Sequence, residues 1–423
     1  MSKALAGLTQ KIFILSLVFL LSPPFSLPVF NTVYLGRFLL YLCLFLVVVM
    51  VATSKKRIFP KLDSYLLAII LFFFFQSVSV VMAVDRGAFL LGYEKVVAGI
   101  FAFIVSSVLV KVRHEETRDK IIKTLFWLAI IRLGAELVLF LFPDLFLSTV
   151  GKLLDRDIAS SISANLLRGR TYIELLQEAS IPFIFYMIYL KGTKIWEQTL
   201  AYFLIILNIF IAFLSNWRGR FIVSLVAVPL SFSLFTKTAR KSMLPLIIFG
   251  SISLFGLYGL DKSQVFSSGF SVIDRLENRE LNDLDSVKWR VRMMGTSFEL
   301  GFTHPLGVGL KNFSQYVTSG TSNPFAPKES VQLGREAVFD GPHNIFPQFM
   351  AETGIAGLLA FGLMLIIFAR HDSKLLRGKP SNSQKALIAF FWLILTSTLF
   401  YPASSLSFYV YFFLARGLLY EVT

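Results

Sequence analysis

The sequence predicts an all-α polytopic membrane protein with about twelve transmembrane helices and one large extramembrane segment that contains short helices. Two properties of the composition lead to this class. The 423-residue chain is 55% hydrophobic and only 16% charged, whereas a typical soluble domain is about 25% charged. Its apolar residues also gather in runs close to the roughly 20 residues that cross a bilayer as a helix. The composition therefore excludes an ordinary soluble domain.

The positions of the apolar runs define the predicted helices. The first run ends at Ser22-Pro23-Pro24, has no small-residue cleavage site and is followed by another span, so we expect an uncleaved helix rather than a signal peptide. The predicted spans are 12–30, 33–52, 64–84, 88–110, 121–142, 179–190, 199–215, 221–236, 243–260, 350–369, 386–400 and 404–420. Nine spans with short loops thus occupy residues 1–260, the large segment is 261–345, and residues 346–423 hold three spans and a cytoplasmic C-terminus.

The distribution of positive charge predicts the orientation. Lysine and arginine gather in alternate loops, and the positive-inside rule places such loops in the cytoplasm. These basic loops contain Lys55, Lys56, Arg57, Lys61, Lys111, Arg113, Arg118, Lys120, Lys191, Lys194, Lys237, Arg240, Lys241, Arg370, Lys374, Arg377 and Lys379. Both termini are then cytoplasmic, and the segments 143–178, 216–220 and 261–345 lie on the opposite side.

The net charge of +15 does not indicate a nucleic-acid partner. The excess charge lies in the loops between spans, and no nucleic-acid motif accompanies it. The partners that the composition predicts are membrane lipids. The single cysteine, Cys43, lies in an apolar run, so the chain cannot form an internal disulfide.

A polar stretch over residues 342–357 carries the strongest sign of chemistry. His343 is one of four histidines in the chain. Asn344, Gln348 and Glu352 follow it at intervals of four residues, just where the large segment meets an apolar span. So many polar groups at the mouth of a membrane helix favour a functional site.

Pro347 and the glycines predict the local structure of this stretch. Because proline lacks an N–H group, Pro347 is tolerated only near a helix start, which makes Asn344 the predicted N-cap. The three polar side chains then share one helix face, and Gly354 and Gly357 allow another helix to approach closely. His343 would lie at the membrane boundary, where its ordinary pKa suits proton transfer. The alternative is a histidine that only caps the span.

Arginines on the side opposite the basic loops form a second candidate group. Arg168 and Arg170 precede the sixth span, Arg218 and Arg220 lie in the turn between the seventh and eighth, and Arg290 lies in the large segment. Guanidinium groups bind phosphate oxygens in a bidentate manner and keep their charge. Several of them around one cavity would hold a diphosphate. The alternative is contact with lipid headgroups.

Charged residues inside the predicted spans have two interpretations. Arg132 and Glu136 are four residues apart and could neutralise each other on one helix. Arg37 and the pair Glu94 and Lys95 could face the interior of the bundle. Structural pairing is the favoured interpretation, and a proton or ion pathway is the alternative.

No metal or nucleotide site is predicted. The aspartate pairs at residues 155–157 and 283–285 match a loose D-x-D pattern, which occurs often by chance. No histidine or cysteine cluster has ligand spacing, and no phosphate-binding loop of the G-x-x-x-x-G-K type is found.

Three blocks of sequence follow one another in the second half of the chain. The first is Arg218-Gly219. The second is Arg290 followed, fifteen residues later, by Pro305-Leu306-Gly307-Val308-Gly309-Leu310-Lys311-Asn312-Phe313. The third is His343-Asn344-x3-Gln348-x3-Glu352-x-Gly354-x2-Gly357. With the layout of the spans, these blocks resemble the O-antigen ligase and polymerase superfamily of bacterial envelope glycosyltransferases over most of the chain.

The resemblance implies a metal-independent, inverting glycosyltransferase without cofactors. It would lie in the bacterial inner membrane with its active site in the periplasm, so that residues 261–345 are a periplasmic segment. A glycan would pass from an undecaprenyl-diphosphate carrier to an acceptor hydroxyl, served by His343, while Arg290 and Arg218 neutralise the leaving diphosphate. The residues expected to bind substrate are Arg220, Arg168, Arg170, Asn344, Gln348 and Glu352, with the roles of Arg168 and Arg170 left open.

The two alternatives within the superfamily, a ligase and a polymerase, differ in the acceptor. A ligase transfers the glycan to lipid A–core, and a polymerase transfers it to a growing repeat-unit chain. The position of the large segment just before the His343 span, and the chain length, favour the ligase. A transporter or flippase of lipid-linked sugars is the alternative from another class, but no internal repeat supports it. A non-catalytic scaffold would not need His343.

Overall fold

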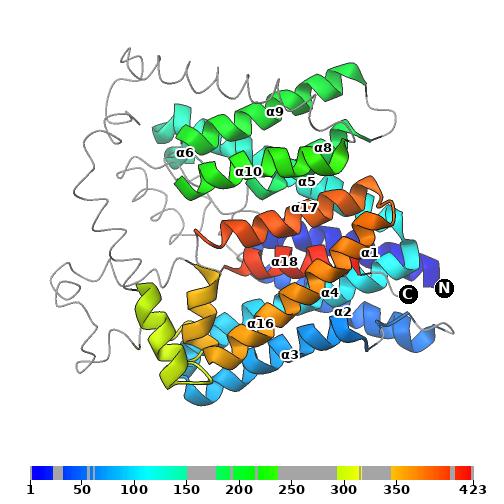
Figure 1. The fold of residues 1–423 in the computed structure, drawn as a ribbon. Coiled ribbons are helices and arrows are strands. Elements are labelled where there is room, and N and C mark those ends of the chain that lie inside the picture. Colours follow the sequence, from blue (N-terminus) through cyan, green and yellow to red (C-terminus); the bar gives the residue numbers. More distant parts are fainter. Residues whose placement is uncertain are drawn as a thin grey trace, which may run out of the picture.

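The computed structural model describes residues 2–21, 32–54, 58–60, 62–149, 178–190, 194–214, 218–236, 293–313, 316, 344–400 and 405–420, and all secondary structure in these ranges is helical. The helices form a bundle (Figure 1). They are α1 (Ser2–Leu21), α2 (Thr32–Thr53), α3 (Ser64–Val78), η1 (Ser79–Met82), α4 (Arg86–Arg113), α5 (Glu115–Leu141), α6 (Pro143–Thr149), η3 (Glu178–Ser180), α8 (Ile181–Ile188), α9 (Ile195–Leu214), α10 (Arg218–Phe235), α16 (Ile345–Arg377), α17 (Asn382–Ser397) and α18 (Leu406–Leu419).

The helices confirm a multi-pass membrane protein. Seven of those described are long and apolar enough to cross a membrane, and three shorter apolar helices accompany them. A helix lies on every predicted span except 243–260, which falls outside the described residues, as does most of 261–345. The count of twelve, the large periplasmic segment and the domain limits therefore stay predictions.

The first helix begins earlier than the predicted span 12–30. Helix α1 starts at Ser2, and within the part that precedes the predicted span the polar side chain of Gln10 is satisfied inside the protein. The side-chain amide of Gln10 donates to Thr117 Oγ1 at 3.2 Å and accepts from Arg113 Nη1 at 2.7 Å. Polar residues with such partners can extend a membrane helix beyond its apolar run.

Side-chain caps fix the starts of several helices. Asp63 accepts from the N–H of Leu66 at the start of α3, and Ser405 accepts from the N–H of Phe408 at the start of α18. Ser381 and Gln384 form a complete capping box at the start of α17. These groups satisfy N–H donors that have no partner within a helix.

Helices α4 and α18 pack side by side at the centre of the bundle, with α3 against α16 and α1 against α2. Glycines permit the central contact. A Cβ atom on Gly99 of α4 would lie 2.7 Å from the carbonyl oxygen of Tyr409, and one on Gly417 of α18 would lie 2.5 Å from that of Phe103. The two backbones therefore approach as closely as small residues allow in membrane proteins.

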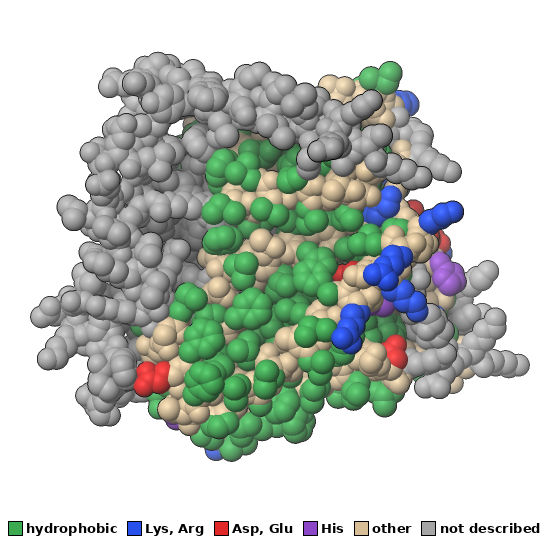
Figure 2. All heavy atoms as spheres, in the orientation of Figure 1, with side chains coloured by type: hydrophobic (Ala, Val, Ile, Leu, Met, Phe, Trp, Pro, Cys, Tyr) green, Lys and Arg blue, Asp and Glu red, His purple; other side chains and the backbone are tan. Residues whose placement is uncertain are grey.

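The two ends of the bundle differ in character. Lysine and arginine side chains gather at one edge of a broad apolar face, on the side where Figure 1 marks both termini (Figure 2). The last turns of α4 and α16 contribute basic residues at this end, and the last turn of α18 contains Arg416, which is buried. We call this side, where α4, α16 and α18 end, the basic end, and the side where they begin the motif end. The basic end corresponds to the predicted cytoplasmic loops.

A buried ion pair joins three helices near the basic end. Arg416 of α18 donates two hydrogen bonds to Asp372 of α16, at 2.6 Å and 2.7 Å. Trp392 of α17 donates its indole N–H to the same carboxylate at 2.8 Å. The guanidinium also lies over the ring of Phe391, 3.4 Å from its centroid. This shared carboxylate fixes the relative positions of α16, α17 and α18.

Helix α16 is interrupted at Gly354. This residue has φ +69° and ψ −174°, so α16 consists of a first part, residues 345–353, and a second part, residues 355–377. The carbonyl oxygens of Ala351 and Glu352 accept hydrogen bonds from the N–H groups of Val308 and Gly309, at 2.9 Å and 3.0 Å. A remote loop thus satisfies carbonyls that the break releases.

The expectation that a helix packs at the two glycines of α16 is corrected by this geometry. A Cβ atom on Gly354 would collide with the carbonyl of Pro305, which lies in a loop, and one on Gly357 would collide with Thr353 of α16 itself. Neither glycine therefore contacts another helix. Gly354 allows the loop to approach α16, and Gly357 leaves room for the side chain of Thr353 in α16 itself.

We expect Gly354→Ala to lower the thermal stability of the purified protein. The methyl group would sit on a backbone with φ +69° and ψ −174°, a region almost restricted to glycine that costs other residues about 1–3 kcal/mol, and it would displace Pro305. The measurement is thermal unfolding in detergent.

Gly362→Ala is the matched control in the same helix. An ideal Cβ atom there meets nothing within 4 Å, so alanine should leave stability equal or slightly higher, since it is the better helix former. Equal unfolding temperatures for the two variants would contradict the importance of the break.

Candidate functional site

The site at the motif end is built around the loop of residues 305–313. The helical segment 293–303 precedes it, and Met293, Leu300, Val308 and Phe313 form a small apolar cluster with Ala351 of α16. The loop thereby lies against the first part of α16. Two of the three sequence blocks, the second and the third, are in direct contact.

Two glycines allow the loop to lie against its neighbours. Gly307 and Gly309 have φ angles of +75° and +92°, which glycine adopts without a steric penalty. A Cβ atom on Gly307 would collide with the backbone of Glu352, and one on Gly309 would lie 2.7 Å from Cβ of Ala83. Larger residues at these positions would force the loop away from α16 and from the segment before α4.

The carboxylate of Glu352 binds the loop from the side of α16. Its Oε1 accepts the backbone N–H of Lys311 at 3.0 Å, and its Oε2 accepts the side-chain amide of Gln348 at 3.2 Å. Glu352 and Gln348 are only 5% and 4% exposed. The shared polar face that the spacing predicts therefore exists for these two residues, and both are engaged within the protein.

Asn344 begins the first part of α16, as predicted. It has an extended backbone, and its side-chain oxygen accepts the N–H of Phe346 at 3.0 Å. The next residue, Ile345, donates its N–H to the carbonyl of Thr398 at 3.0 Å. The start of α16 is thus tied to the end of α17.

Asn312 connects the loop to a third segment of the chain. Its Oδ1 accepts the N–H of Asp85 at 2.6 Å, while its Nδ2 donates to the carbonyls of Asp85 at 3.1 Å and Leu310 at 2.9 Å. Asp85 in turn caps α4 by accepting from Gly87 and Ala88. We call residues 305–313, together with Asp85, Gln348 and Glu352, the interlock.

Sequence reasoning assigned no role to Asn312 or Asp85. Two signals were present: Asp85 directly precedes a long helix, where aspartate favours the cap, and Asn312 is a polar residue at the end of a glycine-rich apolar block.

A second histidine, His304, also borders the loop. Its Nε2 lies 3.3 Å from Oη of Tyr316, and its Nδ1 lies 3.0 Å from Oγ1 of Thr303.

Arg220 lies inside the bundle between two carboxylates. Its Nη2 is 2.6 Å from Oε2 of Glu136, and its Nε is 3.1 Å from Oε1 of Glu178. The side chain is 0% exposed. Glu136, expected to face Arg132 on its own helix, thus forms an ion pair between α5 and α10. Contact of Arg220 with substrate stays a prediction, and its pairing gives it a structural role.

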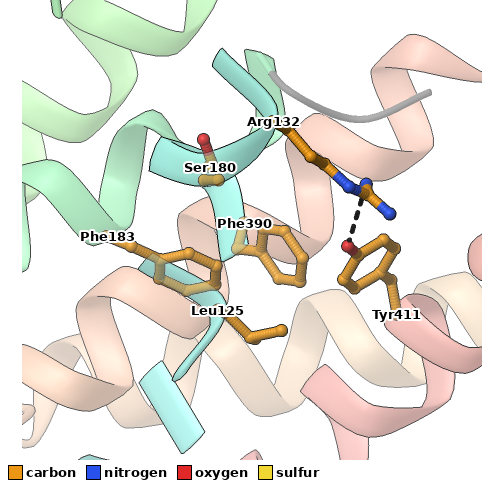
Figure 3. A pocket seen from close by; sticks show the side chains of 7 residues that line it. Leu125, Arg132, Ser180, Phe183, Phe390 and Tyr411 are labelled. Carbon is orange, nitrogen blue, oxygen red and sulfur yellow. Dashed lines mark hydrogen bonds between the residues drawn. The ribbon is translucent and has the colours of Figure 1, made fainter. Parts of the chain in front are cut away.

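Arg132 borders a pocket within the bundle. Its Nη1 donates to Oη of Tyr411 at 3.4 Å. The ring of Phe390 packs against Tyr411, and the ring of Phe183 packs against Phe390 on the other side (Figure 3). The cavity volume is about 10 Å³, which is roughly the space of one water molecule and far below the roughly 300–1,000 Å³ of sites for drug-sized ligands. The pocket is too small for a glycan.

Four predicted site residues fall outside the described residues: His343, Arg290, Arg168 and Arg170. Arg218 opens α10, but its side chain is also outside them. The aspartate pairs 155–157 and 283–285 lie outside as well, and within the described part of the chain no group of three His, Cys, Asp or Glu residues could hold a metal ion. Asn344, which directly follows His343, and Met293, three residues after Arg290, both lie next to the interlock.

All of the interlock except Asp85 lies within a segment that matches a known protein family. The model of the O-antigen ligase family matches residues 203–362, a range that contains all three blocks, α10 and the first part of α16. No curated protein matches the chain. The match confirms the resemblance to the O-antigen ligase and polymerase superfamily, and residues 203–362 of this membrane protein are similar to the O-antigen ligase family.

Proposed function

We propose that the protein is an integral-membrane glycosyltransferase that moves a glycan from an undecaprenyl-diphosphate carrier to an acceptor sugar hydroxyl, with lipid A–core as the favoured acceptor. The observation that carries this proposal is the family match over residues 203–362, combined with the interlock. Two blocks of the matched segment, far apart in sequence, are hydrogen-bonded to each other.

The proposed reaction is an inverting displacement at the anomeric carbon. The acceptor oxygen forms a bond to this carbon while the bond to the diphosphate oxygen breaks, and His343 takes the hydroxyl proton. Arg290 and Arg218 stabilise the negative charge that develops on the diphosphate. Cleavage of the sugar–diphosphate bond supplies the driving force, so the proposal needs no nucleotide and no metal ion.

The interlock supports this proposal through positioning. Met293, three residues after Arg290, and Asn344, directly after His343, belong to segments that contact each other through Val308 and Ala351. Catalytic groups need support of this kind, because small displacements lower the rate. We therefore assign Gln348 and Glu352 a positioning role, since their polar atoms are used within the protein.

The proposed location is the bacterial inner membrane, with both termini in the cytoplasm and the site in the periplasm. The basic residues at the ends of α4 and α16 support this orientation, because positive charge favours the cytoplasmic side. The interlock lies at the opposite end, where α4 and α16 begin.

A repeat-unit polymerase is the alternative within the superfamily. The family match and the interlock suit both enzymes, because a ligase and a polymerase would differ only in the acceptor. The preference for a ligase rests on the position of residues 261–345 directly before the His343 span. Transport of lipid-linked sugars remains the alternative from another class, and no geometry among the described residues favours it.

Reconstitution with two acceptors tests the proposed function. The purified protein in liposomes receives an undecaprenyl-diphosphate-linked oligosaccharide together with either lipid A–core or a second carrier-linked repeat unit. We expect glycan to appear on lipid A–core, measured by gel mobility and mass spectrometry. Extension of the carrier-linked chain alone would establish the polymerase. Movement of the donor across the bilayer without a transfer product would contradict a glycosyltransferase.

We expect His343→Ala and Arg290→Ala each to lower the transfer rate at least about a hundredfold, since each removes a group that acts in the transition state. Expression and thermal stability should be retained. The measurement is the initial rate of glycan transfer by each purified variant.

His114→Asn and Arg377→Ala are the controls. Both residues are exposed at the basic end, and asparagine suits the φ of +44° at position 114. Both controls should keep the parental rate. Unchanged transfer by His343→Ala or Arg290→Ala would remove that residue from the proposed site.

A further inference from the structure

Lys311 occupies an unusual backbone position in the interlock. Its φ is +58°, a left-handed conformation that glycine or asparagine adopts far more readily than lysine. The backbone N–H is held there by Oε1 of Glu352 at 3.0 Å. A backbone outlier that its surroundings maintain is a reason to look for a function of the side chain.

Helix α4 makes room for this side chain. An ideal Cβ atom on Gly92 would lie 3.1 Å from Cβ of Leu310 and 3.3 Å from Cγ of Lys311. The aliphatic part of Lys311 therefore runs across Gly92. Lys95 lies three residues further along α4, hence on the same face. The side chain of Lys311 therefore crosses the face of α4 that carries Lys95, near enough for the charge of one lysine to affect the other.

The charges around Lys95 favour an anionic ligand. Of the groups that act on Lys95, Lys311 and Arg37 are cations and Glu352 is a carboxylate. Arg37 is already paired with Glu94 at 2.6 Å, and Glu352 accepts hydrogen bonds from Lys311 N–H and Gln348. Two neighbouring lysine side chains in a partly buried place repel each other when both are charged, and an anion bound beside them would reduce this repulsion.

Exposed apolar side chains occur near Lys95 along α4 and next to Arg37 along α2, as expected where helices meet the hydrocarbon chains of lipids. Leu90 and Leu91 of α4 are 62% and 59% exposed, and Phe38 of α2, one residue after Arg37, is 62% exposed. An anion that binds here would therefore have an apolar chain attached. Phosphate suits the site because each ammonium group offers three donors and a full charge.

We propose that Lys95 and Lys311 form a binding site for the phosphate or diphosphate group of a membrane lipid, next to the interlock. Two lipids share this chemistry: the undecaprenyl-diphosphate carrier and an anionic phospholipid. Assignment to the carrier rests on the proposed function; the phosphate site itself does not.

Native mass spectrometry of the purified full-length chain tests this site. The probes are undecaprenyl diphosphate, undecaprenol, which lacks phosphate, and phosphatidylglycerol. In Lys311→Gly and Lys95→Gln we expect the affinity for undecaprenyl diphosphate to fall at least about tenfold, the effect of losing one charge-assisted contact. Lys95→Arg should retain binding, and undecaprenol should bind weakly to every variant.

Two controls separate loss of the ligand from loss of the fold. Glycine suits the backbone at position 311, so Lys311→Gly should unfold at the same temperature as the parent or higher. Lys374→Gln, at an exposed position of the basic end, should leave binding unchanged.

The outcomes distinguish the lipids and the two proposals. If phosphatidylglycerol binds and loses affinity in the two lysine variants, while undecaprenyl diphosphate does not, the phosphate site is supported and its ligand is a phospholipid. Equal affinity of the parent, Lys311→Gly and Lys95→Gln for both phosphate lipids would overturn the site. Binding is measured without an acceptor, so a failure of glycan transfer would leave this result standing.

Discussion

The carbonyl groups released at Gly354 are the constraint on which the motif end depends. Backbone polar groups at membrane depth must be satisfied within the protein, and here Ala351 and Glu352 obtain their partners from Val308 and Gly309. This requirement holds the loop 305–313 against α16. The glycines at 307 and 354 permit the approach, and Asn312 extends it to the start of α4. One break in a helix therefore joins three distant segments.

The rest of the bundle gives this arrangement a rigid base. Arg416 and Asp372 fix the later helices to one another near the basic end, and Arg220 joins α5, η3 and α10 through two carboxylates. Buried ion pairs between helices specify how the helices associate in an apolar surrounding. The chemistry that we propose needs such a base, because an arginine set and a histidine from separate segments must meet one diphosphate-linked sugar.

Much of the fold could be predicted because apolar runs and capping residues act locally. The N-cap at Asn344 and the common face of Gln348 and Glu352 follow from the position of Pro347 and the helical period. The break at Gly354 could not be predicted, since a glycine in an apolar run equally suits a packing contact. Its partners lie more than forty residues away in sequence, as do the partners of Arg220 on α5 and η3, and no local pattern encodes such pairs. His343 and Arg290 lie outside the described residues, so their roles stay proposals.

Hydrogen–deuterium exchange of the loop tests the interlock most directly. With the full-length protein in nanodiscs, mass spectrometry of a peptide covering residues 306–313 reports the N–H groups of Val308, Gly309 and Lys311, which are all donated to α16. We expect these N–H groups to exchange as slowly as those of the adjoining helix, because they open only when the interlock opens. Exchange at the rate of an unprotected loop would show that α16 does not hold this segment, and would contradict the account.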